Sequence, residues 1–362
     1  MIALVGEAWG ENEERVKHAF VGTSGLELIK MLGESGLMDL TINDKFYMKK
    51  YWNARDPHEL LRVWDAHPEF LTTNVFNLKP RPTNEISNLC GSKPEGIPNL
   101  RPLRPGKYVR REYTGELERL RAELAQFKGN IIIALGGTAT WALTGQAGIS
   151  KIRGTILQAN TGHKCLPVYH PAAILREWAL RHITILDLEK GRRESAFPEV
   201  RRPTRAIWIE PSLRDMETFY EKYISRCEEL SVDIETASDQ ISCVGFAPSN
   251  RISLVVPFID TRRADGSYWG SVEDERMAWL FVRKCLEHPS RKVFQNGLFD
   301  VGILATKRFA QVVNCAEDTM LLHHALQPES QKGLGFLGSV YTNEPAWKMM
   351  RSKEMGTLKR DE

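Results

Sequence analysis

The sequence predicts an α/β protein with two domains, and three observations lead to this fold class. Four short apolar runs lie between helix-like stretches in the first half of the chain, at Ile2–Gly6, Leu71–Thr73, Ile131–Leu135 and Leu166–Tyr169. Such runs are typical of the buried strands of a parallel sheet. A second group of strand-like segments with short separators begins near residue 228. The length of 362 residues also exceeds the usual size of one domain.

The helices between the first strands follow from apolar residues at helical spacing. Leucine and isoleucine recur along Ser24–Gly36 and Thr114–Phe127, and Ala172–Leu188 follows Pro171, a favourable first-turn residue. The stretch 81–113, rich in Pro, Gly, Asn and Arg, is expected to be a long loop. The first domain is therefore predicted over 1–190, with a central parallel sheet.

A charged segment with two prolines, 191–205, is predicted to link the first domain to a second one over 206–348. The second domain opens with an expected antiparallel meander, whose strands are Glu228–Glu235, Ile241–Phe246 and Ile252–Phe258. The elements expected after it are a helix at Val272–Glu287, a strand at Lys292–Gln295, and helices at Asp300–Lys307 and Asp318–Ala325. Residues 349–362 read as a charged tail.

Composition and charge narrow the class of protein. No run of about 18 apolar residues is present, so we expect no transmembrane segment and no membrane partner. The chain opens on strand-like sequence rather than on a signal peptide. The six cysteines are scattered without a C-x-x-C pair, which favours free thiols in a reducing cytoplasm over disulfides or zinc. The net charge of +3 is too small to indicate nucleic acid by itself.

Polar side chains follow the predicted strands of the first domain. Glu7, Asn74 and His170 come at the ends of three strands, and Gly136 follows the fourth. In an open α/β sheet, ligands bind outside the carboxyl ends of the strands. A carboxylate, an amide and an imidazole are therefore expected to converge at one rim and to form a site.

Short motifs in this domain occur in the order found in a known family. They are GEAWG at 6–10, FVG at 20–22, TNV at 73–75, ALG at 134–136, RG at 153–154 and HPA at 170–172. Through them, residues 1–190 resemble the uracil-DNA glycosylase superfamily, in the branch that usually carries an iron–sulfur cluster. The resemblance implies a three-layer α/β/α fold that excises or recognises a uracil-type base in DNA.

The resemblance also implies roles for the residues at the rim. His170 is expected to donate a hydrogen bond to O2 of the base, where negative charge develops as the N-glycosidic bond breaks. Asn74 would read the edge of a flipped base, and Phe20 would hold its face. Glu7 would place the base or the attacking water. The remaining substrate-binding residues expected are Gly6 and Arg153.

The sequence departs from the family pattern at the cluster ligands and beside the pocket. The chain begins at the first strand, without the upstream cysteine pair, and Leu78 stands where a further ligand cysteine would follow the TNV motif. No iron–sulfur cluster is therefore expected. Trp9 and Ala19 replace the usual prolines beside the pocket, which bears on the choice of substrate.

A second set of acidic residues lies in the second domain. Asp233 and Glu235 alternate on a predicted strand, so both carboxylates face the same side of the sheet. Asp300 enters a helix shortly after Asn296, next to Phe299. Paired carboxylates on a strand with an Asp from a facing helix suit two Mg²⁺ or Mn²⁺ ions, which can activate water against a phosphodiester.

Residues 206–348 resemble the proofreading 3′–5′ exonuclease domain of family A DNA polymerases, which has a ribonuclease H-like fold with a mixed sheet. The VDIET context at 232–236, the DTM motif at 318–320 and the stretch 332–341 carry this resemblance. It implies that Asp233, Glu235 and Asp300 are catalytic metal ligands, and that Asn296 and Phe299 bind substrate.

The exonuclease site is expected to be incomplete. The family's last metal-binding Asp comes from a Y-x-x-x-D motif, and after Tyr341 this chain has Pro345 at that spacing. A site that lacks one carboxylate should bind its second ion poorly. Either the chain is truncated or another polypeptide completes the site.

The distribution of charge favours DNA as the partner. Basic residues with interleaved tyrosines occupy the long loop, at Arg101, Arg104, Lys107, Arg110 and Arg111, with Tyr108 and Tyr113. Such a loop suits phosphate contacts and stacking on unpaired bases. We therefore expect single-stranded DNA or frayed 3′ ends as the partner.

Together these features predict a DNA-processing enzyme of replication or repair. It resembles the N-terminal part of a phage-type family A polymerase, whose polymerase part is expected to be a separate chain in the host cytoplasm. Two alternatives stay open. One is a free-standing uracil-DNA glycosylase whose exonuclease fold serves only as a DNA clamp, and the other is a non-catalytic reader of a modified base.

Overall fold

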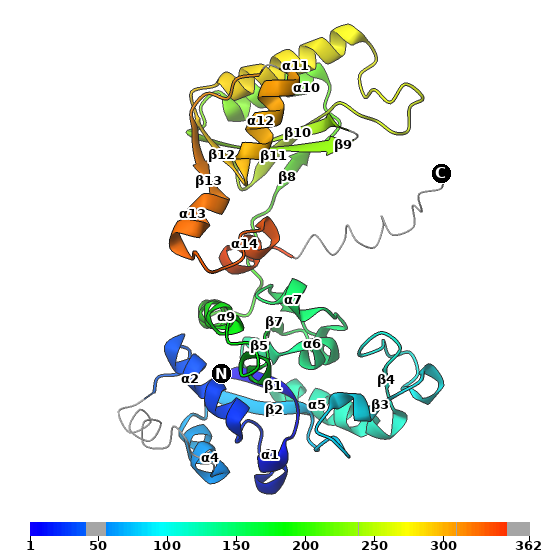
Figure 1. Ribbon diagram of the computed structural model, residues 1–362, viewed down its shortest axis with the longest axis vertical. Helices are drawn as coiled ribbons and strands as arrows, with labels where there is room; N and C mark the ends of the chain where they lie inside the picture. Colours follow the sequence, from blue (N-terminus) through cyan, green and yellow to red (C-terminus); the bar gives the residue numbers. More distant parts are fainter. Residues whose placement is uncertain (41–55, 238, 309, 346–362) are drawn as a thin grey trace. The chain divides into compact units, whose positions relative to one another are not determined.

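The computed structural model describes residues 1–40, 56–237, 239–308 and 310–345, so the expected tail 349–362 lies outside the described residues. The chain forms two compact units (Figure 1). Unit 1 combines Met1–Arg201 with the segment that starts at Gly335, and unit 2 is Arg202–Leu334. Across the described ranges, no helix is both long enough and apolar enough to cross a membrane.

Unit 1 is built on a five-stranded sheet with the order β2-β1-β5-β7-β6. Its strands are β1 (Ile2–Ala8), β2 (Phe70–Phe76), β5 (Ile131–Leu135), β6 (Leu157–Gln158) and β7 (Lys164–Val168). The four longer strands are parallel, and β6 is antiparallel to β7. The four apolar runs thus form a parallel sheet as predicted, and their carboxyl ends meet at one rim.

Helices cover both faces of this sheet and confirm the three-layer arrangement. One face carries α2 (Thr23–Glu34), α4 (Pro57–Ala66) and α9 (Leu180–Glu194), and the other carries α5 (Thr114–Gln126) and α6 (Gly137–Thr144), as Figure 1 shows. Neighbouring strand residues enter different cores, because side chains alternate across a strand. The shorter helices are α1 (Glu11–Val16), α7 (Ile149–Ile152), α8 (Pro171–Ile174) and α14 (Leu334–Tyr341).

Three segments of unit 1 differ from the sequence predictions. The predicted helix Ala172–Leu188 is divided into α8 and α9, because three-residue turns such as Leu180 N to Glu177 O interrupt the helical ladder. Because α9 continues to Glu194, the predicted linker starts inside a helix. The expected loop 81–113 contains a two-stranded ribbon, β3 (Cys90–Gly91) with β4 (Tyr108–Val109), and 3₁₀ turns at Ile86–Leu89, Lys93–Glu95 and Arg111–Tyr113.

Unit 2 contains a six-stranded mixed sheet with the order β13-β12-β9-β10-β11-β8. Its strands are β8 (Ala206–Trp208), β9 (Glu229–Ala237), β10 (Gln240–Ser249), β11 (Ile252–Pro257), β12 (Arg291–Phe294) and β13 (Cys315–Asp318). The predicted meander β9-β10-β11 is antiparallel, whereas β12 pairs parallel with β9, and β13 with β12. The helices are α10 (Leu213–Phe219), the π-helical turn Tyr220–Ile224, α11 (Val272–Glu287), α12 (Gly297–Arg308) and α13 (Thr319–Leu326). This mixed α/β sheet agrees with the ribonuclease H-like class.

Candidate functional site

The carboxyl ends of the parallel strands in unit 1 border a cavity of about 570 Å³. Four of the residues that the sequence analysis places at a site line it: Glu7, Phe20, Asn74 and His170. It is also lined by Gly136 and by further polar residues, among them Thr138, Tyr169, Arg104 and Arg176. A carboxylate, an amide and an imidazole therefore lie together at the carboxyl ends of the strands.

Gly6 makes the space in which Asn74 and Phe20 lie. It pairs in register with Asn74, and a Cβ at Gly6 would lie 2.1 Å from Asn74 Oδ1 and 2.8 Å from the Phe20 ring. Asn74 and Phe20 are 2% and 4% exposed. From α5, Arg119 Nη2 donates a hydrogen bond to the Asn74 carbonyl at 2.7 Å, which fixes this part of β2. A side chain at position 6 is therefore incompatible with this arrangement.

Glu13 joins two loops beside the cavity. Its Oε2 accepts a hydrogen bond from Gly10 N at 3.2 Å, and its Oε1 accepts from Val21 N at 3.1 Å and Gly22 N at 2.9 Å. The first donor follows β1 and the other two follow Phe20, whose φ of 59° lies in the left-handed region. One carboxylate thus holds the Phe20 loop against the end of β1.

The hydrogen bonds of His170 fix its tautomer. His170 caps α8, and its Nδ1 accepts a hydrogen bond from Ala172 N at 3.1 Å, so the proton of the neutral ring lies on Nε2. Burial lowers the pKa of His170; the Glu7 carboxylate opposes this effect and Arg176 reinforces it. His170 is therefore a neutral imidazole at pH 7, with Nε2–H as its donor.

Glu7 accepts a hydrogen bond from a hydroxyl group in the helix that follows β5. Thr138 Oγ1, in the first turn of α6, donates a hydrogen bond to Glu7 Oε2. Gly136 is the N-cap of this helix and has φ of 90°, and a Cβ there would lie 2.9 Å from His170 Cβ. The turn after β5 thus places Thr138 beside Glu7 and packs against His170. The sequence offered one signal for Thr138, its position just after a strand-end glycine.

Arg153 does not line this cavity, and its expected role in substrate binding stays a prediction. The guanidinium is 3% exposed and pairs with both carboxylate oxygens of Asp187 on α9, with Nε 2.6 Å from Oδ2. A third donor, Nη1, reaches Ser339 Oγ at 3.1 Å. The RG motif is present, but α9 and the segment after unit 2 enclose its arginine.

Among the basic residues named in the loop, Arg104 lines the cavity. Arg111 instead donates hydrogen bonds to Pro94 O and Gly96 O, both at 3.1 Å. Tyr113 packs edge-on against Phe76, with 6.3 Å between ring centroids. Part of the loop is therefore structural, and Arg104 with Arg176 supplies the positive charge at the cavity.

In unit 2, Asp233 and Glu235 lie on the exposed face of β9, as the alternation predicts. Asp300 on α12 is 4% exposed, and its Oδ1 accepts a hydrogen bond from Ile234 N, between the other two acidic residues, at 3.0 Å. Burial raises the pKa of Asp300, backbone donors oppose the rise, and the charges of Asp318 and Glu235 add to it.

These carboxylates do not fit a metal ion by themselves. Nowhere in the described part of the chain does a group of three or more His, Cys, Asp or Glu side chains have an arrangement that could hold a metal. The neighbouring Asp318 accepts hydrogen bonds from Asn296 N at 3.1 Å and Gly297 N at 2.8 Å. These hydrogen bonds stabilise the turn before α12. Of the two expected substrate contacts, Phe299 is 51% exposed and Asn296 adopts a left-handed φ of 60°.

A family model and one curated relative match this chain. Residues 1–189 match the family model of the uracil DNA glycosylase superfamily. The type-4 uracil-DNA glycosylase of Thermotoga maritima is 26% identical over 195 residues, which cover 53% of this chain and 76% of that protein.

Two solved structures resemble the chain more distantly. The EXO domain of Aedes aegypti Nibbler has 12% identity and a TM-score of 0.28, covering 38% of this chain and 69% of that one. An EXD2 exonuclease domain soaked in Mg and GMP has 14% identity and a TM-score of 0.25, covering 39% and 72%. Likenesses this distant carry no argument, and the fold of unit 2 rests on its own strand order.

Proposed function

Because the chain belongs to the uracil DNA glycosylase superfamily, and so to the DNA-processing hydrolases, we propose that unit 1 cleaves the N-glycosidic bond of a uracil-type base in DNA. The observation that carries the proposal is the convergence of Glu7, Phe20, Asn74 and His170 on one cavity. Its volume of about 570 Å³ falls in the range of small-ligand pockets and can admit a flipped base.

Each residue of the cavity has a separate role in the proposed reaction. The C1′–N1 bond breaks and its electron pair leaves with the base, whose O2 gains negative charge. The Nε2–H of His170 donates to that oxygen and stabilises the charge. Water forms the new bond to C1′, and the Glu7 carboxylate accepts its proton. Asn74 and Phe20 hold the base, and Arg104 and Arg176 face the flanking phosphates.

For unit 2, we infer that it binds DNA 3′ ends and hydrolyses them only when another polypeptide completes its site. The support is the position after Tyr341 at which the resemblance implies a further metal-binding Asp, because Pro345 stands there. Exposed Phe299 offers a ring on which a terminal base can stack. The partner that we propose is a separate polymerase chain of a phage-type family A replicase, in the host cytoplasm.

One gel assay tests both proposals. End-labelled single-stranded DNA with one uracil is incubated with the protein, in EDTA or in Mg²⁺, and then treated with alkali. We expect an alkali-dependent break at the uracil in EDTA, and its loss in His170→Ala. Uracil-dependent binding without a break would instead support a non-catalytic reader.

The Mg²⁺ arm tests unit 2. The chain alone is expected to give no ladder of shortened products. A Mg²⁺-dependent ladder that Asp233→Ala abolishes would contradict the need for a partner. Retained uracil excision without a ladder is the expected result, and it agrees both with a site that needs a partner and with a unit 2 that serves only as a DNA clamp.

A further inference from the structure

A polar site on unit 1 holds the segment that follows unit 2. Lys190 of α9 is 3% exposed, and its Nζ donates hydrogen bonds to Gly154 O at 2.6 Å, Ser339 O at 2.9 Å and Thr342 O. Ser339 lies in the last turn of α14, and Thr342 directly follows the helix. A cation that binds the last carbonyls of a helix is a favourable C-terminal cap.

Arg153 belongs to the same site and contacts further residues of α14. Besides its hydrogen bond to Ser339 Oγ, its guanidinium carbon lies 5.1 Å from the centre of the Phe336 ring. Arg153 forms an ion pair with the buried carboxylate of Asp187, and Glu194 pairs with a third buried cation, Lys164, at 3.1 Å. Because these ions are paired and Lys190 donates to three carbonyls, every buried cation of the cluster has hydrogen-bond partners.

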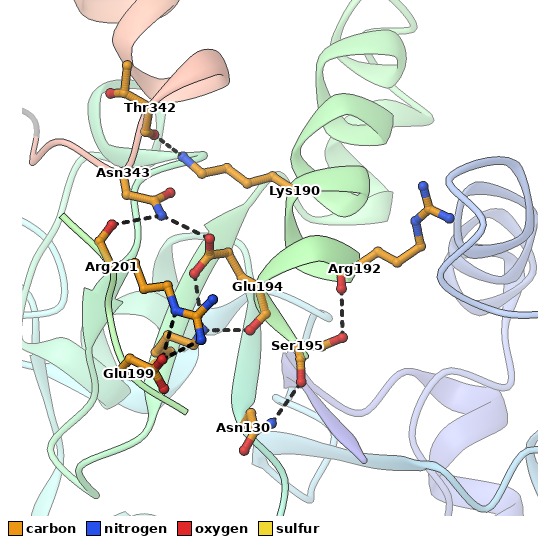
Figure 2. Close-up of polar contacts among 10 residues, drawn as sticks. Asn130, Lys190, Arg192, Glu194, Ser195, Glu199, Arg201, Thr342 and Asn343 are labelled. Carbon is orange, nitrogen blue, oxygen red and sulfur yellow. Dashed lines mark hydrogen bonds and ion pairs between the residues drawn. The ribbon is translucent and has the colours of Figure 1, made fainter. Parts of the chain in front are cut away.

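Asn343 follows unit 2 in the chain and forms hydrogen bonds to residues that precede unit 2, as Figure 2 shows. Its Nδ2 donates to Glu194 Oε1 at 2.9 Å and to the carbonyl of Arg201 at 3.3 Å. Arg201 is the last residue of unit 1 before unit 2 begins. A hydrogen bond therefore connects the residue that directly precedes unit 2 with the segment that follows unit 2.

We propose that Arg153, Lys190 and Glu194 form a docking site for the segment 335–343 of the same chain, which makes unit 2 a closed insertion within unit 1. The partner that the site recognises is the C-terminal end of a helix, through its free carbonyls. The site accounts for two differences from the sequence prediction: Arg153 is enclosed, and the residues after Gly335 pack with unit 1. It does not depend on the proposed catalytic activity.

Amide hydrogen exchange of the full chain tests the docking. In the wild-type protein we expect slow exchange over 335–343. Lys190→Met leaves the carbonyls of Ser339 and Thr342 without their cation. We expect amide exchange over 335–343 to rise about tenfold, since hydrogen bonds to charged groups contribute that much. The matched control is Lys292→Met, because Lys292 in unit 2 is also buried and donates to three carbonyls, those of His288, Ser290 and Val313.

Lys292→Met is expected to change exchange in unit 2 and not over 335–343. Fast exchange over 335–343 in the wild type, or equal rates in the wild type and Lys190→Met, would overturn the proposal. If Lys190→Met does not fold, Asn343→Ala serves with the same measurement. It removes only the hydrogen bonds at the end of the segment, and a rise of about threefold is expected.

Discussion

Among single residues, His170 has its protonation state set by one backbone contact, the hydrogen bond from Ala172 N to Nδ1. A second proton can bind only at Nδ1, which would break this bond and place a cation in a buried position. Both effects favour the neutral ring that the proposed chemistry uses.

The lowered pKa of His170 predicts a pH dependence. Uracil release should stay level from pH 8 to about 6.5, the ordinary pKa of histidine, and fall below it as the imidazolium forms. Stability should fall over the same range, because the unfolded state takes up the proton at a higher pH than the folded state. Single-turnover rates from pH 5 to 8 measure this. A midpoint above pH 7 would contradict the assignment. Glu7→Gln should shift the midpoint to lower pH, because it removes the carboxylate that raises the pKa of His170.

Thr138 is predicted to position Glu7. Thr138→Val removes the hydroxyl donor, and we expect turnover to fall about tenfold with KM unchanged, while Thr138→Ser keeps the rate. If Thr138 acts through Glu7, Thr138→Val should have no further effect in a Glu7→Gln background. Equal losses in both backgrounds would show that Thr138 has a separate, structural role.

For the elements of unit 1, the sheet rim depends on how the loops after the strands are joined. Glu13, the third residue of α1, accepts hydrogen bonds from Gly10, Val21 and Gly22. Without its carboxylate, these three N–H groups lose their acceptor. The Phe20 loop would then no longer be fixed beside the cavity.

Glu13→Ala is therefore expected to lower the free energy of unfolding by about 2–3 kcal/mol and to slow uracil release. The matched control is Glu14→Ala, because Glu14 pairs with Arg81, which is 69% exposed, and such surface pairs contribute about 0–1 kcal/mol. Urea denaturation of both variants measures the difference. Equal effects of the two substitutions would contradict the role of Glu13.

The sequence predicts the elements of the rim well, since each parallel strand is an apolar run and its carboxyl end is the place for polar side chains. Glu7, Asn74 and His170 were found in this way. The break between α8 and α9 was not found, because apolar spacing continues across it. The Glu7–Thr138 hydrogen bond depends on a side-chain orientation that spacing does not encode.

For the whole molecule, the division into two units was visible as a change from alternating strands and helices to a strand meander. The place of α14 was not, because its partners on unit 1 precede it by about 150 residues or more in the chain. The enclosure of Arg153 follows from that long-range contact. A local motif therefore identified the arginine but not its environment.

If unit 2 is a closed insertion, unit 1 should work without it. Replacing Arg202–Leu334 by a short Gly/Ser linker should leave the single-turnover rate of uracil release within about twofold of the full chain, because the residues from Gly335 onward pack with unit 1. Loss of folding in this variant, with an active full chain, would contradict the independence of unit 1.

The measurement that tests the central claim most directly is the single-turnover rate of uracil release in EDTA, for the wild type, His170→Ala and Asn74→Ala. We expect the wild type to release free uracil without a divalent metal. Loss of the His170 donor should slow the release by about 10²–10³-fold, and Asn74→Ala should weaken selection of uracil over other bases. No release by the wild type, or an unchanged rate in His170→Ala, would contradict the proposed base-excision site.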